Sequence, residues 1–329
     1  MATRRVLGLA LAALGLAALQ TPAQAETKLV LGSTAVPGSL IHVTEEEFAK
    51  QVDERSGGKV KIDYFHSSQI GNHKEMLQKV KLGTQDMVTV STVMSTVQPE
   101  FGLYDMPYLV KDRAHAACIS SEIVFPEMAP KLEGQGYKLL GVWENGFRQI
   151  TNNVRPINSP DDLKGIKLRT PRGIWRIKMF EAYGANPTPM AFSEVFVALQ
   201  TGVMDGQENP YTNIWAAKLH EVQKYLSVTN HVYAPFVLLI NKRIWSGLDQ
   251  TTQDMLLQTA DDMQAWTYEK AAELDEKNLR QLLDGGMQQN VADRASFVEA
   301  SKPVYVEFAK EVKGGQALVD KALALADGC

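Results

Sequence analysis

Two short segments in the middle of the chain, GIKLRTPRG at residues 165–173 and DGQENP at residues 205–210, indicate the fold and the position of a binding site. In the first segment apolar residues alternate with Lys167 and Arg169, which predicts a short strand with the two basic side chains on one face. Pro171 ends this strand because proline has no N–H to donate to a sheet. A guanidinium is therefore expected where a strand ends and a helix begins, the edge at which open α/β sheets usually bind ligands.

Three further residues support Arg169 as an anion-binding group. Arg148 precedes another predicted strand, and Arg172 lies at the start of a helix, where backbone N–H groups also favour a negative ligand. Asn209 stands before a proline, which favours an extended backbone and holds the amide in place as a neutral partner. A guanidinium binds a carboxylate through two parallel N–H bonds, so we expect the ligand to carry a carboxylate.

The remaining candidates for the pocket are two aromatic and three small polar residues. Phe192 and Trp175 are candidates for an apolar wall, although a core position explains either aromatic equally well and Trp175 could face away altogether. Thr34, His73 and Ser91 each lie near the end of one of the first predicted strands. Because these strands are expected to be parallel, the three residues should share one rim of a sheet.

The first 25 residues predict a secretory leader. Arg4 and Arg5 precede an apolar run at 6–19, and the small-x-small sequence at 23–25 predicts cleavage after Ala25. The run falls short of the roughly 20 apolar residues that a bilayer-spanning helix needs. We therefore expect a soluble chain exported to the periplasm.

Charge and cysteine content exclude some classes of protein. The chain has 34 Lys plus Arg and 38 Asp plus Glu, and loss of Arg4 and Arg5 with the leader would change the formal charge from −4 to −6. An acidic chain without a basic block does not resemble a nucleic-acid binder. The two cysteines, Cys118 and Cys329, do not have the spacing of a metal site, and we expect free thiols, with a disulfide as the less favoured alternative.

The first part of the chain alternates strands with helices. The pattern predicts strands at 28–32, 59–65 and 87–90, with helices from about 39 to 56 and from 73 to 82 between them. Such alternation is typical of an α/β fold with a mostly parallel sheet. At about 100 to 200 residues per domain, the mature chain is long enough for two lobes.

Later elements complete the expected fold. After the Arg169 strand we expect a helix whose apolar face carries Ile174, Ile177 and Phe180, and then a brief strand at 203–206. Residues 251–284 contain neither proline nor glycine, which predicts one helix of about 50 Å at 1.5 Å per residue. Two helices joined by a kink are the alternative.

Catalytic motifs are absent from the sequence. It contains no Gly-x-Ser-x-Gly elbow, no phosphate-binding loop and no His-Glu-x-x-His pair, so we expect no cofactor, no metal and no enzymatic activity. A secreted enzyme that uses Asp205 or Glu208 as a base on a carboxylate substrate is a less favoured hypothesis.

Several segments resemble one family. The solute-binding proteins of TRAP transporters, the DctP type, are similar to this chain at NGFR (145–148), GIKLR (165–169), GANPTPMAFSEV (184–195) and LQTGVMDGQENP (199–210). The similarity continues through residues 221–226 and the long helix, so that it covers nearly all of the chain that follows the leader.

The resemblance implies a two-lobe periplasmic-binding-protein fold braced by the long helix. It places one lobe at 26–146 plus 235–274 and the other at 147–234 plus 275–329. The lobes would close over an organic acid and deliver it to the small and large subunits of a membrane permease driven by an ion gradient. We expect a monomer. A sensor that presents its ligand to a membrane receptor kinase is the alternative.

The resemblance also assigns roles to residues. It implies that Arg169 forms the main salt bridge to the carboxylate, supported by Arg148 and Asn209, with Phe192 as an aromatic wall. The sialic-acid receptors of the family carry acidic residues where this chain has His73 and Ser91, so sialic acid is not expected.

Two residues that differ from the family pattern bear on the ligand. Arg172 and Trp175 replace smaller or neutral residues that are common in the family at these positions. The extra arginine would suit a second anionic or hydroxyl-rich end, and the tryptophan would stack on a ring. We expect a hydroxy or keto monocarboxylate such as a sugar acid, then an aromatic keto or hydroxy acid, and third a C4-dicarboxylate.

Overall fold

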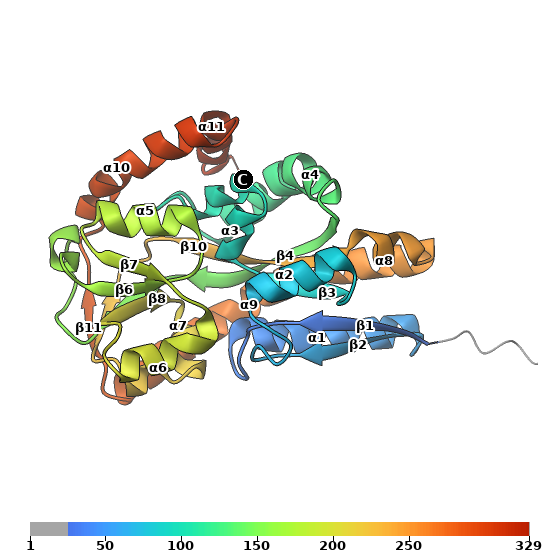
Figure 1. The fold of residues 1–329 in the computed structure, drawn as a ribbon, viewed down its shortest axis with the longest axis horizontal. Coiled ribbons are helices and arrows are strands. Elements are labelled where there is room, and N and C mark those ends of the chain that lie inside the picture. The colour runs from blue at the N-terminus through green and yellow to red at the C-terminus, as the bar shows by residue number, and fades with distance from the viewer. Residues whose placement is uncertain (1–25, 329) are drawn as a thin grey trace, which may run out of the picture.

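Two β-sheets with helices packed around them form two lobes (Figure 1). The structure is a computed structural model and describes residues 26–328; the expected leader and Cys329 lie outside this part of the chain. Within the described residues, no helix is long and apolar enough to cross a membrane.

The first sheet has the strand order β2-β1-β3-β10-β4. Its members are β1 (Thr27–Gly32), β2 (Val60–Phe65), β3 (Met87–Val90), β4 (Tyr137–Phe147) and β10 (Tyr233–Asn241). β1 is parallel to β2 and β3, whereas β10 is antiparallel to β3 and β4. The parallel half is the strand–helix alternation that the sequence predicted.

The second sheet has the strand order β11-β9-β5-β8-β6-β7. Its members are β5 (Gln149–Asn152), β6 (Lys167–Thr170), β7 (Asn186–Pro189), β8 (Gly206–Asn209), β9 (Tyr225–Val228) and β11 (Gln288–Val291). β6 lies between β7 and β8 and is parallel to both, which places Arg169 beside Thr188 and Gln207.

Helices surround both sheets. They are α1 (Leu40–Ser56), α2 (His73–Leu82), α3 (Arg113–Ile119), α4 (Ala129–Glu133), α5 (Ile174–Ala182), α6 (Val195–Gln200), α7 (Tyr211–Ala216), α8 (Lys242–Gly247), α9 (Gln250–Asp284), α10 (Arg294–Glu311) and α11 (Gly315–Leu325). Short 3-10 turns are η1 (Thr92–Thr96), η2 (Pro99–Asp105), η4 (Pro160–Leu163), η5 (Phe192–Glu194) and η6 (Leu219–Glu221), and η3 (Ser120–Met128) is a π-type segment.

Local capping explains why the first two helices begin where the sequence predicted. Ser39 caps α1 by accepting a hydrogen bond from His42 N at 3.4 Å. Asn72 caps α2 and forms a reciprocal capping box with Glu75, which satisfies backbone N–H groups that have no partner inside the helix. Gly57 ends α1 in the left-handed conformation, φ 62°, which glycine adopts without strain.

The long helix α9 braces both lobes. It is one helix of 35 residues capped by Asp249, so the alternative of two helices is wrong. Near its start Leu256 and Ala260 pack in a core with Phe48 and Trp143 of the first lobe. Near its end Leu282 packs in a different core, with residues of α6, α7 and β9. Figure 1 shows α9 passing behind the junction of the lobes.

The chain also crosses between the sheets at two places that lie side by side. β4 ends at Phe147 and β5 begins at Gln149, and Arg148 between them donates its backbone N–H to Val232 O at 2.9 Å. Tyr233 at the start of β10 pairs with Phe147. These crossings place the end of β4 at the junction of the two lobes. The exact lobe boundaries remain a prediction.

The strand expected at 203–206 is wrong by several residues. Gly202, with φ 73°, follows the end of α6 in a turn, and Met204 N donates to Ala198 O at 3.0 Å, so this segment returns to the helix. Val203 is 55% exposed at this turn. The strand begins only at Gly206.

The expected free thiol of Cys118 is also wrong. Cys118 lies in α3 and is disulfide-bonded, and no cysteine among residues 26–328 has a free thiol. Helix α11 packs against α3, and Lys111 Nζ donates to Ala326 O at 3.3 Å. The last described turn of the chain is therefore held against the segment that contains Cys118.

Candidate ligand-binding site

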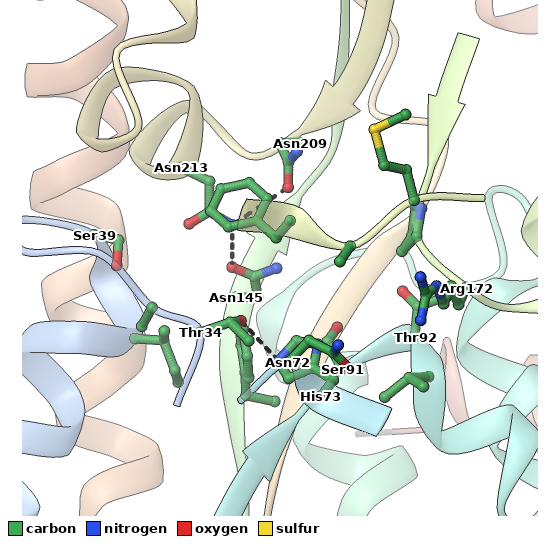
Figure 2. A pocket seen from close by; sticks show the side chains of 18 of the residues that line it. Thr34, Ser39, Asn72, His73, Ser91, Thr92, Asn145, Arg172, Asn209 and Asn213 are labelled. Carbon is green, nitrogen blue, oxygen red and sulfur yellow. Dashed lines mark hydrogen bonds between the residues drawn. The ribbon is translucent and has the colours of Figure 1, made fainter. Parts of the chain in front are cut away.

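A cleft between the sheets contains about 750 Å³ of empty space, part of it open to solvent. Residues from both sheets line it, and these include eight of the nine residues predicted for the site: Arg169, Arg148, Asn209, Phe192, Arg172, Thr34, His73 and Ser91. Figure 2 shows Asn145, Asn209 and Asn213 on one side of the cleft, with Thr34, Asn72, His73 and Ser91 on the other. Among residues 26–328, no acidic side chain lines it.

The three residues predicted for the rim of the first sheet are polar and uncharged, and the exposed Lys74 next to His73 also lines the cleft. Thr34 follows β1, His73 begins α2 and Ser91 follows β3, so the ends of neighbouring elements place the three residues together, as expected. Thr34 Oγ1 and His73 Nε2 are hydrogen-bonded at 2.8 Å (Figure 2). Burial, together with the positive charge of Arg169, lowers the pKa of His73 to about 4, so this imidazole is neutral at neutral pH.

Arg169 is a buried cation without an anionic partner. It lies in β6, is 3% exposed, and donates from Nε and Nη2 to the backbone carbonyl of Met190 at 3.1 and 2.6 Å. Its guanidinium lies 5.9 Å from the ring centroid of Phe192. No carboxylate between residues 26 and 328 forms a salt bridge with it. Burial lowers the pKa of Arg169 to about 9, which still leaves it protonated at neutral pH.

Arg148, by contrast, is fully paired inside the protein. It donates from Nε and Nη2 to the carboxylate of Glu208, and from Nη2 to Asn209 Oδ1 at 3.0 Å. Burial lowers the pKa of Arg148, and the attraction of Glu208 opposes that shift. The second predicted arginine therefore reaches the cleft, but most of its charge is neutralised by Glu208.

A third buried arginine, Arg176, was not predicted. It lies in α5, donates from Nη1 to Glu208 Oε2 at 2.7 Å, and donates from Nη2 to Asp105 Oδ1 at 2.8 Å. Burial alone would lower the pKa of Arg176, but the combined attraction of Glu208 and Asp105 raises it. The sequence instead placed Ile174 and Ile177 on the inner face, and Ile174 is 48% exposed.

The buried charges leave a surplus of one positive charge. Arg148, Arg169 and Arg176 face two carboxylates, Glu208 and Asp105. Burial would raise the pKa of Glu208, but the two paired arginines lower it well below its usual range. Burial raises the pKa of Asp105, which can only increase the surplus. A buried charge needs a partner, so one carboxylate of a ligand would balance this cluster.

His231 beside this cluster adds no charge. Burial lowers its pKa to about 4, and its Nε2 lies 3.1 Å from Glu208 Oε2. The imidazole is therefore neutral at neutral pH and serves as a hydrogen-bond partner of the carboxylate.

Two asparagines were missed as site residues. Asn145 and Asn213 line the cleft with Asn209, and Asn213 Nδ2 donates to Asn145 Oδ1 at 3.0 Å and to Asn209 Oδ1 at 3.4 Å (Figure 2). Asn145 belongs to the NGFR segment, where only Arg148 was singled out. Asn209 ends β8 and Asn213 lies in α7, so no local spacing rule connects them and no signal in the sequence pointed to Asn213.

Trp175 is the one predicted site residue that the structure places elsewhere. It is buried against Phe308 of α10, with ring centroids 5.1 Å apart, and next to Gly102. Helix α5 turns Arg176 toward the junction of the lobes and Trp175 toward η2 and α10, so the tryptophan is a core residue. Arg172 does line the cleft, but its side chain is exposed.

Neither acid that was considered as a catalytic base is suited to that role. Asp205 does not line the cleft; it accepts a hydrogen bond from Lys167 N at 2.8 Å and pairs with the Lys167 side chain. Glu208 is held ionised by two arginines, with its pKa well below the usual range. Among the described residues, no group of three His, Cys, Asp or Glu side chains is placed to hold a metal ion.

Comparisons with known proteins identify the family. The model of the DctP family, described as bacterial extracellular solute-binding protein, family 7, matches residues 31–311. The 2,3-diketo-L-gulonate-binding periplasmic protein YiaO of Escherichia coli K12 is 35% identical over 308 residues, which cover 93% of this chain and 94% of YiaO.

Solved structures agree with this assignment. The sugar acid binding protein DctPAm from Advenella mimigardefordensis, solved with galactonate, has a TM-score of 0.88 and 31% identity over 92% of this chain and 99% of its own. A TRAP periplasmic solute-binding protein from Haemophilus influenzae with bound L-gulonate has a TM-score of 0.86 and 30% identity over 91% of this chain and 100% of its own. The chain therefore belongs to the DctP family, the solute-binding proteins of TRAP transporters.

Proposed function

We propose that this protein captures a hydroxy or keto monocarboxylate of the sugar-acid type and delivers it to a TRAP permease. The observation that carries the proposal is Arg169, a buried guanidinium in the cleft whose hydrogen bonds go only to the backbone carbonyl of Met190 among residues 26–328. A carboxylate would supply the missing negative charge and accept parallel N–H bonds from the planar fork.

The rest of the cleft favours a ligand with several oxygen atoms. The first-sheet rim offers hydroxyl groups and a neutral imidazole, and asparagine amides from both lobes also line the cleft. Most polar groups other than the arginines and Lys74 therefore form neutral hydrogen bonds. Such groups suit hydroxyl and keto oxygens and leave no counter-charge for a ligand cation. The bound galactonate and gulonate of the two similar structures are acids of this kind.

Membership in the family supports delivery to a permease made of small and large membrane subunits. It also supports export to the periplasm with cleavage after Ala25 and action as a monomer. A binding role without catalysis fits a cleft beside which Glu208, bonded to the lining residue Arg148, is kept ionised and occupied by arginines. The permease, the cleavage site and the monomeric state each belong to this proposal.

A thermal-shift screen tests the ligand class. Purified residues 26–329 would be heated with sugar acids, with aromatic keto and hydroxy acids, and with C4-dicarboxylates. A ligand present at several hundred times its dissociation constant should raise the free energy of unfolding by about 3 to 4 kcal/mol. We expect sugar acids to produce the largest shift in melting temperature.

Arg169→Lys is the matched variant for this screen. It keeps the positive charge but loses the planar fork, so we expect most of the shift to disappear. The proposal would have to be abandoned if no acid shifts the transition and mass spectrometry after denaturation finds no acid already bound to the purified protein.

A further inference from the structure

The amide groups at the base of the cleft belong to a hydrogen-bond chain that runs in one direction. Asn209 Nδ2 donates to Gln207 Oε1 at 2.5 Å, and Gln207 Nε2 donates to Thr151 Oγ1 at 2.8 Å. The Thr151 hydroxyl donates to Gln223 Oε1 at 2.9 Å, and Gln223 Nε2 donates to the backbone carbonyl of Val222 at 3.0 Å. Each member accepts from one neighbour and donates to the next.

Fixed partners at two points determine this direction. The oxygen and nitrogen of a side-chain amide have nearly the same shape, so their assignment normally depends on the neighbours. A backbone carbonyl such as that of Val222 can only accept, and a guanidinium can only donate. Arg148 Nη2 lies 3.0 Å from Asn209 Oδ1. Asn209 must therefore turn its oxygen toward Arg148 and its NH₂ group toward Gln207.

The same polarity passes from Asn209 to the side chains that face the cleft. Because Asn209 Oδ1 is an acceptor, Asn213 approaches it with its NH₂ group, at 3.4 Å, and donates its other N–H to Asn145 Oδ1 at 3.0 Å (Figure 2). The oxygen of Asn213 accepts only a long bond from Thr212 at 3.4 Å. The oxygen of Asn145 is thereby occupied, and its amide nitrogen must point elsewhere.

That nitrogen is a donor without a hydrogen-bond partner in the part of the chain that the structure describes. Asn145 is 2% exposed and lines the cleft, yet its Nδ2 donates to no other residue between 26 and 328. This nitrogen is not among the fully buried polar atoms that lack a partner, so it is reachable from the cleft and water can satisfy it until a ligand oxygen takes its place. The arrangement keeps a single donor directed at the cleft, and the fixed chain behind it prevents the amide from rotating to present its oxygen instead.

We propose that Asn145 is a specificity-determining residue that donates a hydrogen bond to an oxygen of the ligand other than its carboxylate. Asn209 and Asn213 act as positioning residues that fix the polarity of Asn145. The inference rests on the proposed function, because it requires a carboxylic acid in the cleft. A hydroxyl or keto oxygen satisfies the donor, whereas a plain alkyl chain leaves it unpaired and an ammonium group, which can only donate, is rejected.

The test compares two acids with the same carbon chain length. D-galactonate carries a hydroxyl group on each of the five carbons beyond its carboxylate, and hexanoate carries none. Their dissociation constants would be measured by calorimetry with the wild type, with Asn145→Ala, and with Asn186→Ala as a matched control on an exposed position of β7. We expect Asn145→Ala to weaken galactonate binding by about tenfold or more, to change hexanoate binding by less than about threefold, and Asn186→Ala to change neither.

A second variant covers the case in which Asn145→Ala does not fold. Asn145→Asp keeps the size of the side chain and its acceptor for Asn213, but it replaces the free donor with an acceptor. Its negative charge repels both acids, so the ratio of the two affinities is the informative quantity. We expect that ratio to fall by at least tenfold in favour of hexanoate.

The outcomes separate this inference from the proposed function. Equal losses for the two acids in the Asn145 variants, or equal wild-type affinities, would overturn the role of Asn145 and leave carboxylate capture intact. Wild-type protein that binds neither acid, nor any other carboxylate in the thermal-shift screen, would overturn the proposed function and this inference with it.

Discussion

Arg176 and Arg169 are both buried arginines near the junction of the lobes, but their surroundings differ. Arg176, in α5, is paired with Glu208 and Asp105 at 2.7 and 2.8 Å. Arg169, in β6, donates only to the carbonyl of Met190 among residues 26–328. Both side chains are within a few per cent of complete burial. The two sites therefore differ in charge compensation and not in burial.

The comparison separates structural from ligand-binding charge. A buried ion pair whose charges balance each other holds elements together, here α5 with β8 and η2, and its charges are not available to a ligand. A buried cation that lacks a counter-ion destabilises the folded protein through the desolvation of its charge. At Arg169 an anionic ligand would offset this unfavourable free energy when it binds.

The largest expected effect is on stability and comes from Arg176→Met. Methionine fills similar space but leaves Asp105 without its cation and removes one of the two arginines from Glu208. Breaking one side of a buried ion pair typically costs about 3 to 5 kcal/mol of unfolding free energy. Urea unfolding of the protein without ligand, followed by circular dichroism, would measure it.

Arg280→Met is the control for that experiment. Arg280 lies on α9, its side chain is 70% exposed, and it pairs only with Glu276. An exposed pair of this kind contributes at most about 1 kcal/mol. A loss at position 176 no larger than the loss at position 280 would show that the buried network does not hold the lobes together.

The same substitution at position 169 should change stability little and weaken ligand binding strongly. Arg169→Met removes a buried cation that has no counter-ion, so the unfolding free energy without ligand should change by less than about 1 kcal/mol or rise. Affinity for a sugar acid should fall by about 2 to 5 kcal/mol, because the ligand carboxylate would then be buried without its partner. Calorimetric titration with D-galactonate, beside urea unfolding of the same sample, would measure both quantities.

Two results would contradict the distinction between Arg169 as a ligand-binding residue and Arg176 as a structural one. If Arg169→Met retained its affinity for galactonate, the ligand carboxylate would have to be bound by another cation of the cleft. Destabilisation as large as that of Arg176→Met would mean that Arg169 has a structural role in spite of its missing counter-ion.

Glu45 extends the comparison to a buried acid without a cation. It is buried in α1 and accepts hydrogen bonds from Tyr64 Oη at 2.5 Å and from the Thr89 hydroxyl. Burial raises its pKa from 4.5 to about 7, although these hydrogen bonds oppose the shift. The folded state therefore holds the proton more tightly than the unfolded state does.

This raised pKa predicts a pH dependence that Glu45→Gln should remove. The contribution of Glu45 to stability is fully present below pH 4.5 and is lost as the pH rises through 7, and it amounts to roughly 3 kcal/mol. Glutamine resembles the protonated acid, so the variant should lose this part of the decline. Urea unfolding at several pH values between 4.5 and 8 would compare the two proteins, and parallel curves would contradict the assignment.

The sequence predicted those parts of the molecule that depend on local signals. Capping residues and glycines set α1 and α2 at the expected bounds, and the absence of breakers predicted α9 as one helix. Alternation placed Arg169 on a strand, and the strand ends brought Thr34 and His73 to one rim.

What the sequence did not predict depends on contacts between distant segments. Arg176 of α5 can be buried because Asp105 in η2 and Glu208 in β8 accept its hydrogen bonds. A periodic pattern of apolar residues cannot reveal partners that lie in distant segments. The sequence left Trp175 as either an apolar wall of the pocket or a core residue, and only its contact with Phe308 of α10 shows that it belongs to the core.

Arg172 gives the smallest expected effect, since it lines the cleft but is exposed and forms no ion pair with any residue from 26 to 328. A cation in that position attracts an anion through water, where the interaction is weak and screened by salt. Arg172→Ala should lower the affinity for galactonate by about two- to fivefold at low ionic strength, mainly through slower association, and by less at high salt. Stopped-flow binding at two salt concentrations, with Arg280→Ala as the control, would measure this. A loss that is large and independent of salt would mean that Arg172 contacts the ligand directly, and the surplus charge of the cleft would then be shared between two arginines.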